Sequence, residues 1–161
     1  CSFKQKDYDV QVVLTSGGAR FTTPLTLSTV SGNSVLQSMW DDQGTWHNHV
    51  QLAKNSDLLL IAPASANCIA KLANGLCDEM LYALYLSSTC PVIVAPAMDL
   101  DMWKHASVQR NIAHLVQDGV HVLEPATGFL ASGLEGQGRL PDAEIITAFA
   151  EDVLGQSTQA S

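Results

Sequence analysis

The stretch from Asp57 to Asp78, DLLLIAPASANCIAKLANGLCD, decides the fold class. An apolar run over residues 58–62 is interrupted by Pro63 and small polar residues, and apolar side chains resume at helical spacing over residues 69–76. This pattern predicts a buried strand, a loop and a helix. In an open parallel sheet, such a loop lies at the carboxyl end of its strand, where ligands bind against the N–H groups of the next helix.

The loop residues Ser65, Ala66 and Asn67 therefore occupy a ligand position. Their small side chains would let a flat ligand approach the backbone, and Ser65 or Asn67 could form a hydrogen bond with it. The same residues also suit an ordinary helix cap. This stretch alone does not decide between the two interpretations.

Strands and helices alternate along the rest of the chain. The apolar patterns and proline positions predict strands at 10–14, 91–95 and 120–123, and helices at 21–30, 79–88, 107–117 and 141–154, with a short helix entered from Thr45. The segment 126–138 contains four glycines, so we expect an irregular flap or a plain loop there. The alternation predicts an α/β fold in which helices cover both faces of a doubly wound parallel sheet. We expect one domain over residues 1–154, followed by a tail or the start of a linker at 155–161.

The composition excludes several classes of function. With 161 residues, of which 47% are hydrophobic and 15% charged, the chain is long and apolar enough for one globular core. A formal net charge of -8 argues against a nucleic-acid partner. No apolar run approaches the roughly 20 residues that cross a bilayer, and no signal peptide is visible, so no membrane partner is expected.

Cysteines and histidines give no sign of a metal site. The four cysteines, Cys1, Cys68, Cys77 and Cys90, show neither a C-x-x-C pair nor metal-ligand spacing, which favours a reduced, cytoplasmic setting. His47 and His49 are two residues apart and cannot share a helical face, so at most one of them points at the loop of residues 65–67. Thr15 and Ser16, at the end of the first predicted strand, occupy either another ligand position or a hydroxyl-rich turn.

Several longer motifs point to a family. They are HVQLAKNSD at 49–57, PASAN at 63–67, KLANGLCDEML at 71–81, PAMDLDMW at 96–103 and ASGLEGQGRL at 131–140. Together they resemble the flavin-containing cysteine decarboxylases, over nearly the whole chain from Val10 to about Ala150. Within that family they are most similar to the branch that decarboxylates 4′-phosphopantothenoylcysteine in coenzyme A biosynthesis, in the form that is the N-terminal half of a bifunctional protein.

The resemblance implies a three-layer, Rossmann-like (flavodoxin-like) fold with FMN as cofactor. It also implies a homo-oligomer built from trimers, with the flavin between subunits, and a C-terminal synthetase domain in the natural protein. The flavin contacts that it implies are Thr15, Ser16, Phe21, Ser65, Ala66, Asn67, Cys68 and Ala97. The substrate contacts that it implies are Asp99, Met102, Leu130 and Ala131. His49, which opens an H-x-x-L-x-x-x-x-D stretch, corresponds to the catalytic base.

The chain departs from the family pattern at three places. The family begins with a strand and a small-residue loop that grips the flavin phosphate, and here both would lie before Cys1. Asp99 stands where the family has asparagine, and Ser132 stands where it has a flap cysteine that resembles a proton donor. A serine hydroxyl is far less acidic than a thiol, so we expect Ser132 to order a water molecule or the substrate during catalysis.

The expected reaction converts 4′-phosphopantothenoylcysteine into 4′-phosphopantetheine. Oxidation of the thiol to a thioaldehyde by the flavin makes CO2 loss possible, and re-reduction of the resulting ene-thiol gives the product. His49 would manage protons at neutral pH. Two alternatives stay open: an oxidative decarboxylase of a C-terminal peptidyl cysteine, which belongs to a branch that also lacks the flap cysteine, and a non-catalytic flavin-binding regulatory subunit.

Overall fold

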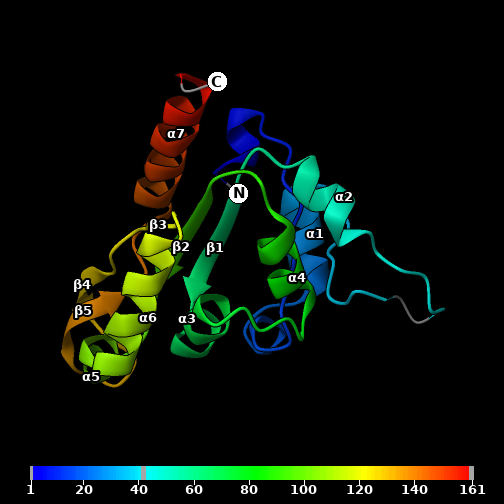
Figure 1. Cartoon of the computed structure of the whole chain (residues 1–161). Helices are drawn as coiled ribbons and strands as arrows, with labels where there is room; N and C mark the ends of the chain where they lie inside the picture. The colour runs from blue at the N-terminus through cyan, green and yellow to red at the C-terminus, as the bar shows by residue number, and fades with distance from the viewer. Residues whose placement is uncertain (1, 41–42, 160–161) are drawn as a thin grey trace.

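The computed structural model describes residues 2–40 and 43–159, so Cys1 lies outside the described residues. A parallel sheet forms the centre of the molecule, with β1 (Leu59–Ala64), β2 (Val92–Pro96) and β3 (His121–Val122) in the order β1-β2-β3 (Figure 1). A separate antiparallel hairpin is made by β4 (Ala126–Phe129) and β5 (Glu135–Arg139).

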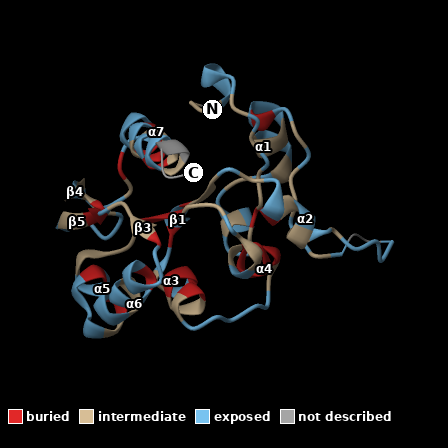
Figure 2. Ribbon diagram, turned by 45° about the horizontal axis from the view of Figure 1, so that its top comes forward, coloured by how far each residue is buried: buried red, intermediate tan, exposed pale blue. Residues whose placement is uncertain are grey.

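Helices lie on both sides of the sheet, as the sequence predicts. Figure 2 shows α7 on one side and α3 and α6 on the other. The helices are α1 (Pro24–Ser31), α2 (His49–Lys54), α3 (Ala66–Ala73), α4 (Met80–Ser87), α5 (Leu100–Lys104), α6 (Ala106–Gln117) and α7 (Ala143–Gln159), with short 3-10 turns at Lys4–Lys6 and Gly18–Arg20. In the part of the chain that the structure describes, none of these helices has the length and apolar character to cross a membrane.

The core follows from the apolar runs of the sequence. All five residues of β2 are buried, because helices cover both faces of this central strand. One cluster joins β1 and β2 to α3 and α6 through residues such as Ile69 and Leu115, and a second joins α2 to α4 through Ala53 and Met80. A third cluster packs α7 on the sheet. Each large aliphatic side chain buried in this way contributes roughly 2 kcal/mol.

Two predicted elements that precede β1 differ from the structure. Residues 10–14 do not form a ladder strand; instead, Val13 makes an isolated parallel bridge with Leu36. Helix α2 begins after Asn48, whose side chain accepts from the N–H of Gln51 at 2.9 Å, and not near Thr45. The residues before Asn48 are held extended by an antiparallel bridge between Trp40 and Trp46, so a helix cannot start there.

Helix α7 is longer than predicted. It continues to Gln159, so residues 155–159, which were expected to form a tail, are helical. Gly155 does not end the helix, because its backbone does not adopt the left-handed conformation that typically stops one. The domain boundary at Leu154 stays a prediction.

The prediction of an irregular segment at 126–138 is wrong, because this segment forms most of the β4–β5 hairpin. Two of its glycines permit a close approach that no other residue would allow. A Cβ atom at Gly136 would lie 2.8 Å from Cδ1 of Leu100, and one at Gly138 would collide with the carbonyl oxygen of Met98. The backbone N–H of Met98 donates to the oxygen of Gly138 at 3.0 Å, which fixes the hairpin against the loop after β2.

Candidate functional site

The loops that follow β1 and β2 lie side by side at one edge of the sheet. The N–H of Ala97 donates to the carbonyl oxygen of Ala64 at 3.0 Å. This bond places the residue before Ser65 directly against the start of the 97–99 loop. Two of the segments predicted to contact flavin are therefore neighbours, as expected at the carboxyl ends of adjacent parallel strands.

The start of α3 presents unused hydrogen-bond donors. The Ser65 hydroxyl accepts from the N–H of Cys68 at 3.3 Å and caps the helix. Among the described residues, no acceptor is found for the N–H groups of Ala66 and Asn67. These two donors, together with the positive end of the helix dipole, suit an oxygen-bearing or anionic ligand.

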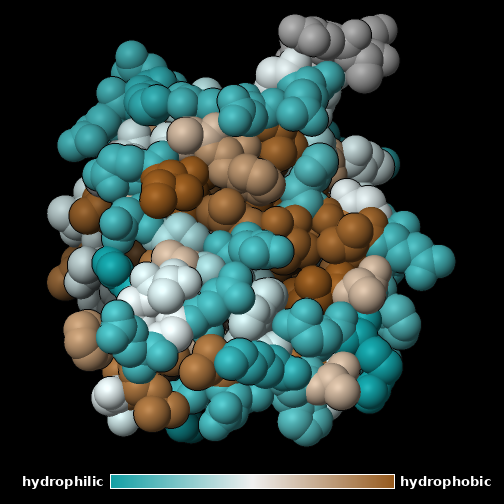
Figure 3. Space-filling view, turned by 90° about the vertical axis from the view of Figure 1, so that its left-hand side faces the viewer, coloured by the Kyte–Doolittle hydropathy of each residue, from teal (hydrophilic) through white to brown (hydrophobic). Residues whose placement is uncertain are grey.

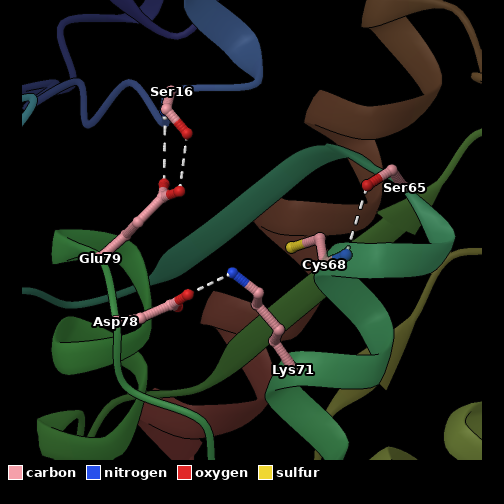
Figure 4. A network of polar contacts seen from close by, with 6 residues as sticks. All are labelled: Ser16, Ser65, Cys68, Lys71, Asp78 and Glu79. Carbon is pink, nitrogen blue, oxygen red and sulfur yellow. Dashed lines mark hydrogen bonds and ion pairs between the residues drawn. The ribbon is translucent and has the colours of Figure 1, made fainter.

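The side chain of Cys68 faces the core beneath this turn. Burial raises the pKa of its thiol from the ordinary 9.0 to about 11, although a hydrogen bond with Tyr82 acts in the opposite direction and lowers this pKa. Lys71 lies 5.0 Å above the Tyr82 ring. It also forms an ion pair with Asp78 at 2.6 Å (Figure 4), which raises the pKa of Lys71 and lowers that of Asp78. A contact between Cys68 and a flavin stays a prediction, and its thiol is packed as a core side chain.

The loop of residues 15–18 is fastened to the start of α4. The Ser16 hydroxyl donates to Oε1 of Glu79 at 2.7 Å, and its backbone N–H donates to Oε2 at 3.3 Å (Figure 4). Thr15 stabilises the same turn by accepting from the N–H of Gly18 at 3.1 Å. Phe21, just after the turn, has 93% of its surface exposed and offers an apolar ring to a ligand or a partner.

A cavity of about 300 Å³ lies between the loop after β2 and the hairpin, a size that suits a small ligand. Four of the predicted contact residues line it: Ala97, Asp99, Leu130 and Ala131. The other lining residues are Met98, Phe129, Gly138, Arg139 and Leu140. Sequence reasoning missed Arg139, although it is the only cation between residues 126 and 140.

Two of the predicted site residues do not line this cavity. Met102 is on α5 with 48% of its surface exposed, and Ser132 is at the tip of the hairpin, where its hydroxyl accepts from the N–H of Leu134 at 3.5 Å. Figure 3 shows the side of the molecule that carries α5 and the hairpin, with apolar surface gathered near its centre. The exposed apolar side chains of these elements and of α7 include Met102, Phe129 and Ile145.

His49 is the first residue of α2, on a different side of the molecule. Its ring meets the Trp46 ring edge-on, at 5.7 Å between centroids, and its Nδ1 atom is buried with no partner among the described residues. Helix α2 packs on α4, and in both Figure 1 and Figure 2 the sheet separates these helices from the hairpin. A single chain therefore does not bring His49 to the cavity.

Residues 2–155 match the family named Flavoprotein. The chain belongs to the Flavoprotein family. This match covers almost all of the chain and confirms the resemblance that the PASAN and PAMDLDMW motifs indicate, together with the prediction of a flavin protein.

Curated relatives of this Flavoprotein-family chain include proteins with two different names. The coenzyme A biosynthesis bifunctional protein CoaBC of Bacillus subtilis is 41% identical over 157 residues, covering 97% of the chain and 39% of that protein. A cysteine/cysteine sulfinic acid decarboxylase of an unknown prokaryotic organism is 51% identical over 125 residues, covering 77% of the chain and 35% of that protein. The chain thus spans between a third and two fifths of the length of these relatives.

Solved structures confirm the predicted fold. A cysteine-to-serine mutant of PPC decarboxylase, complexed with pantothenoylaminoethenethiol, has a TM-score of 0.80 at 29% identity and covers 94% of this chain and 86% of its own. The FMN-dependent cysteine decarboxylase SpaF has a TM-score of 0.76 at 32% identity and covers 92% of this chain and 79% of its own. The name of this neighbour includes FMN, which is also the cofactor that the sequence predicts.

The residues of the chain fit a flavin. The free N–H donors at the start of α3 match the carbonyl and phosphate oxygens of such a cofactor, and the small side chains of Ala66 and Ala97 leave its ring system room. The unpartnered Nδ1 of His49 shows that this imidazole lacks part of its hydrogen bonding within the described residues.

Proposed function

We propose that the chain is an FMN-dependent decarboxylase domain that acts on 4′-phosphopantothenoylcysteine. The observation that supports this most is the cavity between the 97–99 loop and the hairpin, which adjoins the PASAN turn through the Ala97 to Ala64 hydrogen bond. A cofactor against the turn would then lie next to a substrate in the cavity. The CoaBC relatives, which match nearly the whole chain, support a substrate from coenzyme A biosynthesis.

In this proposal, FMN lies against the start of α3 and the loop of residues 15–18. Ala66 and Asn67 supply backbone donors, Ser65 keeps the turn in shape, and Ser16 is held in place by Glu79. When bound, FMN would accept two electrons from the substrate thiol, and the thiocarbonyl formed by this oxidation would be the electron sink that CO2 loss requires.

His49 is the proposed proton acceptor for the substrate thiol. An imidazole can take and return a proton at neutral pH, and the burial of Nδ1 leaves Nε2 as the nitrogen that can reach a ligand. Because His49 and the cavity lie on different sides of the same chain, we propose that the active site is shared between two copies in a homo-oligomer. The exposed rings of Trp40 and Trp46, near His49, are suited to such an interface.

Asp99 and Ser132, which depart from the family pattern, have proposed roles in binding the substrate and a water molecule. Asp99 lines the cavity at the start of α5 and forms no side-chain cap, so its carboxylate is available to the substrate amide N–H. Ser132 is exposed at the hairpin tip, one residue from the lining residue Ala131, and there it is suited to ordering a water molecule over the substrate.

A second candidate function is favoured by one relative. The cysteine/cysteine sulfinic acid decarboxylase is more similar over its matched segment than the CoaBC proteins are. That activity would need only part of the cavity, because its substrate lacks the pantothenoyl arm. Oxidative decarboxylation of a peptidyl cysteine and a regulatory role without turnover are the remaining candidates.

Product analysis of the FMN-loaded protein separates these functions. The protein is incubated with 4′-phosphopantothenoylcysteine, with cysteine and cysteine sulfinic acid, or with a peptide ending in cysteine, and products are identified by mass spectrometry. We expect 4′-phosphopantetheine and CO2 from the first substrate, and neither from a His49→Asn variant that still carries flavin. Turnover of cysteine alone, an ene-thiol from the peptide, or bound flavin with no turnover would each replace the proposal with the corresponding alternative.

A further inference from the structure

Among the described residues that line the cavity, Arg139 is one of two that carry a charge, and it is the only cation. It lies on β5 opposite Ala126, and its side chain passes across Gly128, where an added Cβ atom would lie 3.5 Å from the arginine Cδ. The absence of a side chain at Gly128 thus leaves an open path for the arginine along the hairpin.

The guanidinium of Arg139 has spare hydrogen-bonding capacity. Its Nη2 group donates to Oδ1 of Asp142 at 2.7 Å, and no other acceptor is found for it among the side chains of residues 2–40 and 43–157. An arginine side chain carries five N–H donors in a planar fork that matches a carboxylate or a phosphate. Most of these donors are therefore available to a ligand.

The second charged residue of the cavity creates a need for such a cation. Asp99 would repel an anionic substrate group placed beside it, and the remaining lining residues are Met98 and small or apolar side chains that carry no charge. The substrate of the proposed reaction is an anion at both ends, with a carboxylate on its cysteine and a phosphate on its pantothenoyl arm. The described lining residues offer neither group a cation other than Arg139.

We propose that Arg139 binds an anionic oxygen group of the substrate and so compensates for Asp99. This inference rests on the proposed function. It makes Arg139 a residue that selects acidic substrates, and Asp99 a residue that orients the neutral amide beside them. The hairpin then covers the cavity and also supplies its positive charge.

Two probes that cannot lose CO2 distinguish the sources of the anion. N-pantothenoylserine carries the carboxylate without a phosphate or a thiol, and 4′-phosphopantetheine carries the phosphate without the carboxylate. Their binding to the FMN-loaded protein is measured by calorimetry for the wild type and for Arg139→Gln, Arg139→Lys and Arg110→Gln. Arg110 is an exposed arginine on α6 that does not line the cavity, so its variant is the charge-matched control.

We expect Arg139→Gln to weaken the binding of one probe at least tenfold, Arg139→Lys to weaken it less, and Arg110→Gln to leave it unchanged. Loss for N-pantothenoylserine assigns the carboxylate to Arg139, and loss for 4′-phosphopantetheine assigns the phosphate. Wild-type affinity of Arg139→Gln for both probes would overturn the inference.

Two further measurements exclude a merely structural effect and a wrong substrate. Both partners of the Arg139–Asp142 ion pair are more than half exposed, so Asp142→Asn is expected to keep the fold and the affinity. An equal loss in Asp142→Asn, with no rescue by Arg139→Lys, would assign Arg139 to the fold and overturn the inference. If the wild type binds neither probe, the proposed function fails. Binding of cysteine sulfinic acid is then measured instead. Equal affinity of the wild type and Arg139→Gln for cysteine sulfinic acid would overturn the inference.

Discussion

Ser16 and Glu79 are joined by two hydrogen bonds, one from the serine hydroxyl at 2.7 Å and one from its backbone N–H at 3.3 Å. They come from the loop after the Val13 bridge and from the residue that precedes α4, which are far apart in the sequence. The carboxylate therefore holds a loop of the proposed flavin site against a helix that also packs on α2, the helix of His49.

Loss of this carboxylate should weaken FMN binding. Glu79→Ala removes both acceptors of Ser16, and we expect affinity to fall about tenfold, as for the loss of one hydrogen bond to a charged group. Glu79→Gln keeps one acceptor and should lose less. Flavin fluorescence titration measures the effect, with the exposed Glu144→Gln as control. Unchanged affinity and unchanged exchange protection of the Ser16 N–H in Glu79→Ala would refute this positioning role.

The close packing of the hairpin predicts a strong difference between two glycines. Gly138→Ala would press a methyl group against the carbonyl of Met98. We therefore expect a loss of about 2 kcal/mol in the free energy of unfolding. Gly155→Ala meets no atom within 4 Å and lies inside α7, so it should stabilise by about 0.5–1 kcal/mol. Urea denaturation of both variants compares them, and equal stability would contradict the observed packing.

Substitution of Ser65 separates a cap from a cofactor contact. Ser65→Ala removes the acceptor for the Cys68 N–H and should cost about 1 kcal/mol of stability. Ser65→Asp retains a capping oxygen and should keep the stability. If Ser65 only caps α3, the aspartate variant binds FMN like the wild type; if Ser65 contacts the cofactor, as predicted, the added charge weakens FMN binding while the melting temperature stays the same.

Sequence reasoning predicted the parallel sheet, its helices and the PASAN turn because each depends on local patterns. The apolar run before Pro63 and the helical spacing after Asn67 determine their structures without reference to distant segments. The same holds for α4 and α6, which lie within a residue or two of their predicted bounds.

The hairpin and the arginine in the cavity depend on contacts between distant segments. Glycine usually argues against a strand, but here Gly136 and Gly138 let β5 approach Leu100 and Met98, which no pattern within the segment could reveal. The position of Arg139 in the cavity depends on the same approach. Likewise, the motif that selects His49 contains no information about which side of the sheet α2 occupies.

The thiol of Cys68 should react slowly with alkylating reagents. With a pKa of about 11, about a thousandth of it is ionised at pH 8, and its burial limits access further. The exposed Cys77 should be labelled by iodoacetamide much faster. Mass spectrometry of timed samples follows each site, with Cys77→Ser as control. Fast labelling of Cys68 in the folded protein would show that its thiol faces solvent.

The same thiol predicts a loss of stability at alkaline pH. Burial raises its pKa from 9.0 to about 11, so between these values the unfolded chain has released a proton that the folded chain still holds. The free energy of unfolding should therefore fall as the pH rises through this window, by roughly 2–3 kcal/mol at most. Cys68→Ala should show a flatter profile between pH 9 and 11, and an identical slope would contradict the assignment.

The separation of His49 from the cavity predicts that activity can be restored by mixing two inactive chains. His49→Asn leaves the cavity intact, whereas Ala131→Trp fills the cavity and leaves the imidazole intact; because Ala131 is exposed, the second variant should still fold. Each variant alone should be inactive. If a site combines the histidine of one copy with the cavity of another, mixed oligomers should have about a quarter of their sites complete.

Decarboxylation measured after the two variants are unfolded and refolded together checks this, and the double variant refolded with itself is the control. A mixture as inactive as its components would mean that both groups act within one chain, and that the chain must rearrange to bring them together.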